Sequence, residues 1–226
     1  MPGAHRGSCN PACDLTEDVV FLGGAVAGLL VTDPASPAIR PTLDIDVLVE
    51  VTTRGEYYRF QERLRQRGFL EAAGEAVICR FRHGSLMLDV MPTEPGILGF
   101  ANRWYASAAR DFWIMTMDSV TLRVVSPACF LATKLEAFHG RGNGDFMLSH
   151  DMEDIITVID GRSNIVADVS MTEPAVRDYL REQFALLIEN RFFLDALPAH
   201  LPGDVGSQKR LPILLDRVAR LAGKVI

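Results

Sequence analysis

Two acidic residues stand two positions apart in the apolar segment Leu43-Asp44-Ile45-Asp46-Val47. Side chains alternate between the two faces of a β-strand, so Asp44 and Asp46 project from the same face. Neighbouring carboxylates repel each other, and their burial costs free energy unless a cation lies between them. This spacing predicts a site for Mg²⁺, or for Mn²⁺, because Mg²⁺ takes one or two carboxylates and accepts substrate phosphates. The alternative is the solvent-facing edge of a half-exposed strand.

A third acid lies in a second apolar segment, Leu86-Met87-Leu88-Asp89-Val90. If this segment forms a strand beside the first, Asp89 joins Asp44 and Asp46 at one edge. Three convergent carboxylates can hold two metal ions about 4 Å apart, which suits an in-line phosphoryl displacement. Asp89 would then act as the base towards an attacking hydroxyl, or bind the metal that activates it. The alternative is an ion pair with an arginine such as Arg80 or Arg82.

A glycine pair, Gly23-Gly24, precedes the first two acids in the chain. Glycines let a backbone approach a ligand closely, and N–H groups at a helix start can bind an anion. The pair is therefore predicted to bind phosphate. Thr42 stands two residues before Asp44 and is predicted to add a hydroxyl contact.

A lysine and two further acids follow in the second half of the chain. Lys134 lies in a predicted helix and is expected to contact phosphate; the alternative is a surface lysine paired with Glu136 or Asp151. Asp151 and Asp154 are three residues apart and would share one face of a helix. They are expected to contribute to the same site, the alternative being an exposed acidic face that complements the helix dipole.

As a set, Gly23-Gly24, Asp44-Ile45-Asp46 and Leu88-Asp89-Val90 resemble the signature of the nucleotidyltransferase superfamily, which has the polymerase-beta type of fold. The resemblance implies that the glycine pair opens a helix, that two aspartates on the next strand bind the metals, and that a third acid on a later strand completes the site. It covers about residues 19–160.

One branch of that superfamily matches the later motifs more closely. The segments Ala132–Ala137 and His150–Ile155 resemble the pattern of the AbiEii-type toxin nucleotidyltransferases of abortive-infection systems. The resemblance implies that Lys134 contacts nucleotide phosphates and that the later aspartates shape the same cleft. Two departures stand out: His150 replaces a frequent arginine, and Asp44 lies 20 residues after Gly24 where the family has about ten. The proline-rich segment 32–41 accounts for the extra length and suggests a lid or an altered substrate entry.

The pattern of elements predicts a mixed α/β part followed by a helical C-terminal region. Together with this pattern, the resemblance implies an α+β fold, a nucleotidyltransferase-like mixed β-sheet with flanking helices. Residues 14–125 would form the α/β core, and residues 126–226 a helical domain that completes the cleft. Periodicity and turn signals place the elements. Expected strands are 19–22 (before a glycine turn and a helix up to residue 31), 43–51, 77–82, 86–91 and 121–125, with a three-residue hairpin at 83–85. Expected helices are 55–68, 129–138, 149–160, 173–194 and 211–225.

Composition narrows the class of protein. The chain has 226 residues, of which 48% are hydrophobic and 23% charged, as in globular proteins. A net charge of −6 disfavours sequence-independent binding to duplex nucleic acid, which depends on Lys and Arg. The four cysteines are too few and scattered for a disulfide framework and favour the cytoplasm. The longest strongly apolar run, residues 19–31, is shorter than the roughly 20 residues that span a bilayer, so no membrane association is expected.

Together with these residues, the resemblance implies a metal-dependent nucleotidyltransferase that transfers NMP from an NTP to an acceptor hydroxyl or phosphate. A tRNA end or a protein side chain as acceptor would make the protein the toxin of a toxin–antitoxin pair, with an antitoxin as partner. A small molecule such as an aminoglycoside would make it a resistance-type enzyme. The alternatives are a non-catalytic nucleotide-binding or interaction module of the same fold and a metal-dependent phosphohydrolase.

Overall fold

One mixed β-sheet carries the acidic residues. Its strands are β1 (Val19–Leu22), β2 (Asp44–Val49), β3 (Leu70–Glu71), β4 (Arg80–His83), β5 (Leu86–Pro92), β6 (Phe112–Met117) and β7 (Val120–Val125). The computed structural model describes residues 13–42, 44–72 and 79–224. Within them the strand order is β3-β4-β5-β2-β1-β7-β6. β2 pairs in parallel with β5, and β1 with β7, whereas the other pairs are antiparallel.

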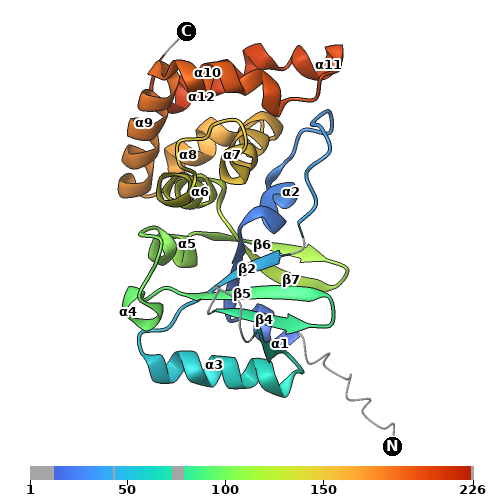
Figure 1. The fold of residues 1–226 in the computed structure, drawn as a ribbon, viewed down its shortest axis with the longest axis vertical. Helices are drawn as coiled ribbons and strands as arrows, with labels where there is room; N and C mark the ends of the chain where they lie inside the picture. Colours follow the sequence, from blue (N-terminus) through green and yellow to red (C-terminus); the bar gives the residue numbers. More distant parts are fainter. Residues whose placement is uncertain (1–12, 43, 73–78, 225–226) are drawn as a thin grey trace, which may run out of the picture.

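Helices cover both faces of this sheet and form the second half of the chain (Figure 1). They are α1 (Cys13–Thr16), α2 (Ala27–Leu30), α3 (Arg54–Gln66), α4 (Pro95–Leu98), α5 (Tyr105–Arg110), α6 (Pro127–Arg141), α7 (His150–Gly161), α8 (Ile165–Met171), α9 (Pro174–Glu189), α10 (Arg191–Ala196), α11 (Val205–Gln208) and α12 (Leu211–Leu221), with the 3₁₀ turns η1 (Gly24–Val26) and η2 (Leu197–His200). The mixed sheet with flanking helices and a helical C-terminal region confirms the predicted α+β class.

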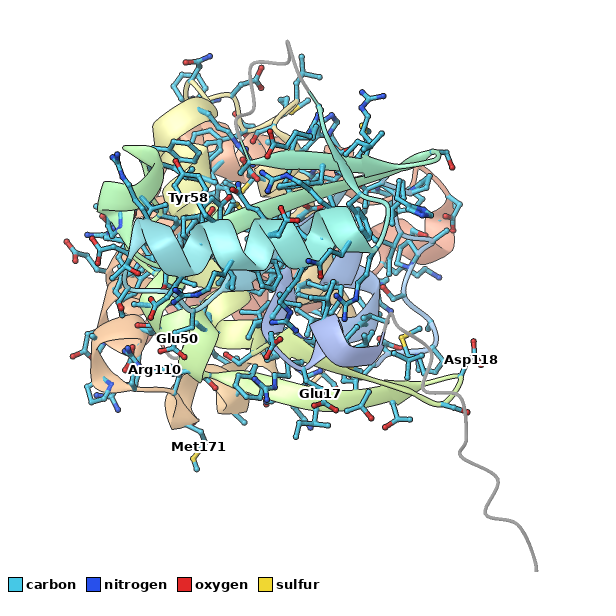
Figure 2. All side chains as sticks on the ribbon, turned by 90° about the horizontal axis from the view of Figure 1, so that it is seen from below. Glu17, Glu50, Tyr58, Arg110, Asp118 and Met171 are labelled. Atoms are coloured by element: carbon cyan, nitrogen blue, oxygen red, sulfur yellow. The ribbon has the colours of Figure 1, made fainter. Side chains whose placement is uncertain are left out.

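Helix α3 covers the lower face of the sheet in the view of Figure 1. A capping box starts it, in which the Thr53 side chain accepts a hydrogen bond from the backbone N–H of Glu56 and the Glu56 side chain accepts one from that of Thr53. Tyr57, Phe60 and Leu64, at helical spacing, are buried against this face. Figure 2, seen from below, shows α3 lying across the sheet, with Asp118 at the tip of the β6–β7 hairpin.

The upper face of the sheet shares one hydrophobic core with the C-terminal helices. This core joins Leu22, Leu48 and Val124 of the sheet to side chains of the helices, including Phe130 and Ile155. The expected boundary at residues 125 and 126 falls between the end of β7 and the start of α6. The division into two domains stays a prediction, since one core connects both halves.

Several predicted elements need correction. The hairpin between β4 and β5 has a two-residue loop, because His83 pairs with Leu86, and not the three-residue loop expected. The helix expected over 173–194 is interrupted at Asn190, whose side chain accepts hydrogen bonds from the N–H groups of Phe192 and Phe193 and so starts α10. The strand expected from residue 77 begins at Arg80; residues 77 and 78 lie outside the described residues.

The sequence patterns did not indicate some elements at all: β3, β6, α4, α5, α8, α11 and η2. None of the helices that the structure describes combines the length and apolar character needed to cross a bilayer.

Candidate active site

The three predicted acids come together where β2 and β5 run side by side. Asp46 lies directly opposite Asp89 in the parallel register, and Asp44 lies two residues earlier on β2. All three line a cleft of about 1180 Å³ between the sheet and helices α6 and α7. Ile45 and Val47, which alternate with them, line an apolar hollow on the opposite face. The alternation of faces predicted from the sequence is therefore confirmed.

Gly23 makes room for the Asp46 side chain. A Cβ atom at Gly23 would lie 1.9 Å from Asp46 Oδ2, so any other residue at this position would force the Asp46 side chain to move. Its backbone also has φ of 73°, in the left-handed region that favours glycine. Gly23 is followed by the turn η1 and the single helical turn α2. The glycine pair thus opens a short helical segment, and its first member is needed for contact with the acid on the next strand.

The environment of Asp46 disfavours its charged form. Burial raises the pKa of its carboxyl to about 6; the charges of Asp89 and Asp44 add to the increase, while Lys134 and Arg141 oppose it. Because a raised pKa in a cleft marks a group poised for proton or cation binding, Asp46 is a functional candidate on physical grounds.

Arg80 on β4 binds two of the three acids. Its Nε donates to Asp89 Oδ1 and its Nη2 to Asp89 Oδ2, both at 2.8 Å. The same Nη2 lies 3.2 Å from Asp44 Oδ2. Arg80 stands directly opposite Asp89 in the antiparallel β4–β5 pair, so strand register brings the two side chains together. Asp89 therefore forms the ion pair that the sequence had offered as the alternative to a catalytic role.

The carboxylate oxygens of Asp44 and Asp46 are suitable ligands for one hard divalent cation. Asp44 Oδ1 is buried and, among the described residues, has no hydrogen-bond partner. Asp44 and Asp46 share one face of β2 and offer carboxylate oxygens, the ligands that Mg²⁺ prefers. Within the described ranges, no group of three or more His, Cys, Asp or Glu side chains is arranged to hold a metal ion. Asp44 and Asp46 are therefore the candidate ligands for such an ion, and the predicted part of Asp89 in binding it stays a prediction.

Lys134 lies opposite these acids, on helix α6. Ser126 starts this helix by accepting a hydrogen bond from the N–H of Cys129, with Pro127 in the first turn. Lys134 is 8% exposed, and its Nζ lies 3.1 Å from Asp151 Oδ1 and 2.6 Å from Asp154 Oδ2. Lys134 is therefore not a surface lysine, although its pairing with Asp151 was foreseen as the alternative.

Asp151 and Asp154 share one face of α7, as their spacing predicted. Both are 4% exposed, so they do not form the exposed acidic face of the alternative interpretation. Arg141, at the end of α6, binds Asp151 through Nε at 2.8 Å and Nη2 at 2.9 Å. Burial alone would raise the pKa of Asp151, but hydrogen bonds from Arg141 and the charge of Lys134 lower it. These two acids therefore serve to hold cationic groups in the cleft.

Gly24 and Thr42 lie at the same cleft. A Cβ atom at Gly24 would lie 3.2 Å from Asp154 Oδ2, so the glycine allows α7 to approach closely. The Thr42 hydroxyl accepts a 3.4 Å hydrogen bond from the N–H of Asp44 and so supports the start of β2. The predicted contacts of these two residues with a nucleotide remain predictions.

Arg40, at the end of the proline-rich segment 32–41, is a cleft residue that the sequence patterns did not indicate. Its Nε lies 3.1 Å from Glu153 Oε2 and its Nη2 3.7 Å from Asp154 Oδ1, beside Gly24. The segment thus brings a cation into the cleft. Arg80 was considered only as a partner for Asp89. The one available signal was that a cleft rich in acids needs cations to balance them.

Comparison with known proteins gives a likeness of fold. An antigenic nucleotidyltransferase-like protein from Paracoccidioides brasiliensis is similar over 70% of this chain and 81% of its own, with 17% identity and a TM-score of 0.46. The antibiotic-resistance factor ANT(2'')-Ia is similar over 78% of this chain and 89% of its own, with 18% identity and a TM-score of 0.46. No family model and no curated protein matches the chain significantly. The activity proposed below therefore rests on the residues of the cleft.

Proposed function

We propose that this protein is a divalent-metal-dependent nucleotidyltransferase. A single observation carries the proposal: Asp44, Asp46 and Asp89 face one cleft from two paired strands, with Gly23 packed against Asp46 and Lys134 on the opposite wall. A cleft of about 1180 Å³ is large enough for a nucleoside triphosphate together with part of an acceptor. The combination of paired acids and buried cations suits a phosphate-rich substrate better than an uncharged one.

The reaction would be an in-line displacement at the α-phosphorus of an NTP. An acceptor hydroxyl or phosphate oxygen forms a bond to this phosphorus, the bond to the bridging oxygen of pyrophosphate breaks, and a hydroxyl acceptor releases its proton. A carboxylate that lines the cleft would accept that proton. Lys134, fixed by Asp151 and Asp154, would neutralise the negative charge that develops on the phosphoryl oxygens.

Asp44 and Asp46 are the residues that would hold the metal ion. When bound, Mg²⁺ or Mn²⁺ supplies charge neutralisation at the phosphates and orients them. Gly23, Gly24 and Thr42 are proposed to bind or position the nucleotide near the start of α2 and β2. The predicted role of Asp89 as base or metal ligand requires oxygens that here accept hydrogen bonds from Arg80.

The acceptor defines the biological role. A tRNA end or a protein side chain would fit a toxin with an antitoxin partner, and a small molecule would fit a resistance-type enzyme. Cys79 and Cys129 are buried free thiols, in keeping with the proposed cytoplasmic location. The second function, a non-catalytic nucleotide-binding module, is favoured by one observation, the engagement of Asp89 by Arg80.

Transfer of label tests the proposal. The protein is incubated with each α-³²P-labelled NTP and Mg²⁺, with total RNA, lysate proteins, aminoglycosides and the protein itself as acceptors. The test variant is Asp44→Asn/Asp46→Asn. The matched control is Glu50→Gln, because Glu50 follows β2 directly but is exposed outside the cleft (Figure 2).

We expect label on one acceptor class with the wild type and the control, and at least a 100-fold loss with the test variant, on the order of what removing an electrostatic stabiliser costs. Metal-dependent NTP binding without label on any acceptor would instead support the non-catalytic module. Release of inorganic phosphate from the NTP would support a phosphohydrolase. Absence of NTP binding would refute the nucleotidyltransferase.

A further inference from the structure

Arg80 stands where a second cation would be needed if all three acids bound metal. Its side chain is 16% exposed and that of Asp89 is 11% exposed, so this pair is shielded from water. Two parallel N–H···O contacts of 2.8 Å join them. Bidentate arginine–carboxylate pairs of this kind are among the strongest charge-assisted hydrogen bonds in proteins. Arg80 therefore has a defined place beside Asp89 and extends from there to Asp44.

Both oxygens of Asp89 are thus directed to a guanidinium. A divalent ion bound to the same oxygens would have to lie close to a fixed positive charge, and guanidinium cannot lose its proton to relieve the repulsion. The Asp44 oxygen that Arg80 contacts is Oδ2, whereas Oδ1 is the buried oxygen without a hydrogen-bond partner in the described residues. Coordination by Asp44 Oδ1 and Asp46 leaves the Arg80 contacts intact.

The sum of the charges agrees with a metal site at Asp44 and Asp46 beside a separate Arg80–Asp89 ion pair. When ionised, Asp44, Asp46 and Asp89 carry three negative charges, and Arg80 returns one positive charge. The remaining two negative charges match a single divalent cation. On the other wall, the three cations Lys134, Arg141 and Arg40 balance the three acids Asp151, Asp154 and Glu153, so that cluster is neutral by itself. Two divalent ions would leave the corner with an excess of positive charge before any nucleotide phosphate enters.

We infer that the cleft takes one divalent cation, at Asp44 and Asp46, and that Arg80, positioned by Asp89, supplies the positive charge that a second ion would otherwise provide. The inference rests on the proposed function and assigns a different role to Asp89: it acts through Arg80 and does not bind metal. Arg80 would then face the acceptor oxygen or the reacting phosphate as a fixed cation.

The number of bound metal ions tests this directly. Mn²⁺ is titrated into the protein and counted by the loss of the free-ion EPR signal, with an NTP analogue in which a methylene group replaces the α,β-bridging oxygen. The variants are Arg80→Gln and Asp89→Asn. The matched control is Arg82→Gln, which removes the same charge from an exposed position two residues further along β4.

We expect one Mn²⁺ per chain in the wild type, in Arg82→Gln and in Asp89→Asn, with an Mn²⁺ dissociation constant changed less than about 3-fold in Asp89→Asn. In Arg80→Gln, the Asp89 carboxylate has lost its arginine partner, so the number of Mn²⁺ ions bound per chain should rise to two. In label transfer, Asp89→Asn should lower kcat by about 10–100-fold, as loss of a positioning partner does, and leave KM for the NTP nearly unchanged.

Two Mn²⁺ in the wild type, or loss of an ion in Asp89→Asn, would overturn the inference while the proposed function stands if label transfer persists. A count of one in Arg80→Gln would also contradict it. If Arg80→Gln does not fold, Asp89→Asn still distinguishes one ion from two. No Mn²⁺ and no label with the wild type would refute the proposed function itself.

Discussion

Asp46 combines a functional position with a cost to stability. Its pKa of about 6 in the folded protein exceeds the ordinary value of 3.8. The folded state therefore binds this proton more tightly than the unfolded state does. The contribution of Asp46 to stability is favourable below the unfolded pKa and is lost as the pH rises through the folded pKa. At neutral pH the ionised carboxylate destabilises the metal-free protein by about 1–3 kcal/mol.

Asp46→Asn should therefore stabilise the metal-free protein while abolishing label transfer. We expect its free energy of unfolding to exceed that of the wild type by about 1–3 kcal/mol at pH 8, and the difference to shrink towards pH 4. Urea unfolding in EDTA at several pH values measures this. Glu50→Gln, in which no buried charge is removed, should show no such pH-dependent gain. A variant less stable than the wild type at every pH would contradict the assigned environment of Asp46.

At the scale of elements, the turn between β1 and η1 determines whether β2 can present its acids. A side chain at Gly23 meets two obstacles, the positive φ and the carboxylate of Asp46. Gly99 has a similar φ of 79°, but a Cβ atom there would have no neighbouring atom within 4 Å. A substitution at Gly99 therefore shows the effect of the positive φ alone.

Gly99→Ala should cost about 1–2 kcal/mol of stability, from backbone strain alone. Gly23→Ala should cost more and should also weaken Mn²⁺ binding at least 10-fold, because Asp46 must move. Thermal unfolding and EPR titration of both variants give the comparison. Equal losses of stability with unchanged metal binding would show that Asp46 can yield to the methyl group.

Sequence patterns predicted the elements whose signals are local. β2 and α3 follow from alternation and helical spacing, and the capping residues of α6 and α7 mark where those helices start. β6 was missed because its alternation is weak and its pairing with β7 depends on a turn at Asp118 and Ser119, both with positive φ. A positive φ is uncommon for residues other than glycine, and this turn contains no glycine, so the sequence did not predict it.

In the candidate site, too, the sequence predicted only what depends on local patterns. The shared face of Asp44 and Asp46 is a property of one strand, so the sequence sufficed to predict it. The pairing of Arg80 with Asp89 depends on the register between β4 and β5, and Arg40 meets Glu153 from a distant part of the chain. Such contacts arise only from tertiary packing, which spacing along the chain does not encode.

At the scale of the whole molecule, Arg210 joins three distant segments. Its guanidinium lies 2.8 Å from Asp160 on α7 and 2.7 Å from Asp33, and donates to the carbonyl of Ala35 at 3.3 Å. Asp160 has only 3% of its side chain exposed, so Arg210 and not water is the partner of its carboxylate. Arg210 thus connects the start of α12, the C-terminal end of α7 and the proline-rich segment.

Arg210→Met should lower the free energy of unfolding by about 3–5 kcal/mol, because it leaves the buried Asp160 carboxylate unpaired. Arg220→Met removes an exposed pair with Asp216 from the same helix and should cost less than about 1 kcal/mol. Urea unfolding of both variants measures the difference. Adding Asp160→Asn to Arg210→Met should recover part of the loss; no recovery would mean that Arg210 acts through packing.

The position of β1 has a consequence for the folding of this chain during its synthesis on the ribosome. β1 lies between β2 and β7, and Phe21 pairs with Val124, which is made about a hundred residues later. At about 5–20 residues per second, roughly 5–20 s pass between the synthesis of these two partners. Throughout that interval one edge of the nascent β1 has unmet backbone hydrogen bonds, and such edges attract other strands. A chaperone that binds extended apolar segments could therefore bind this strand until β7 emerges.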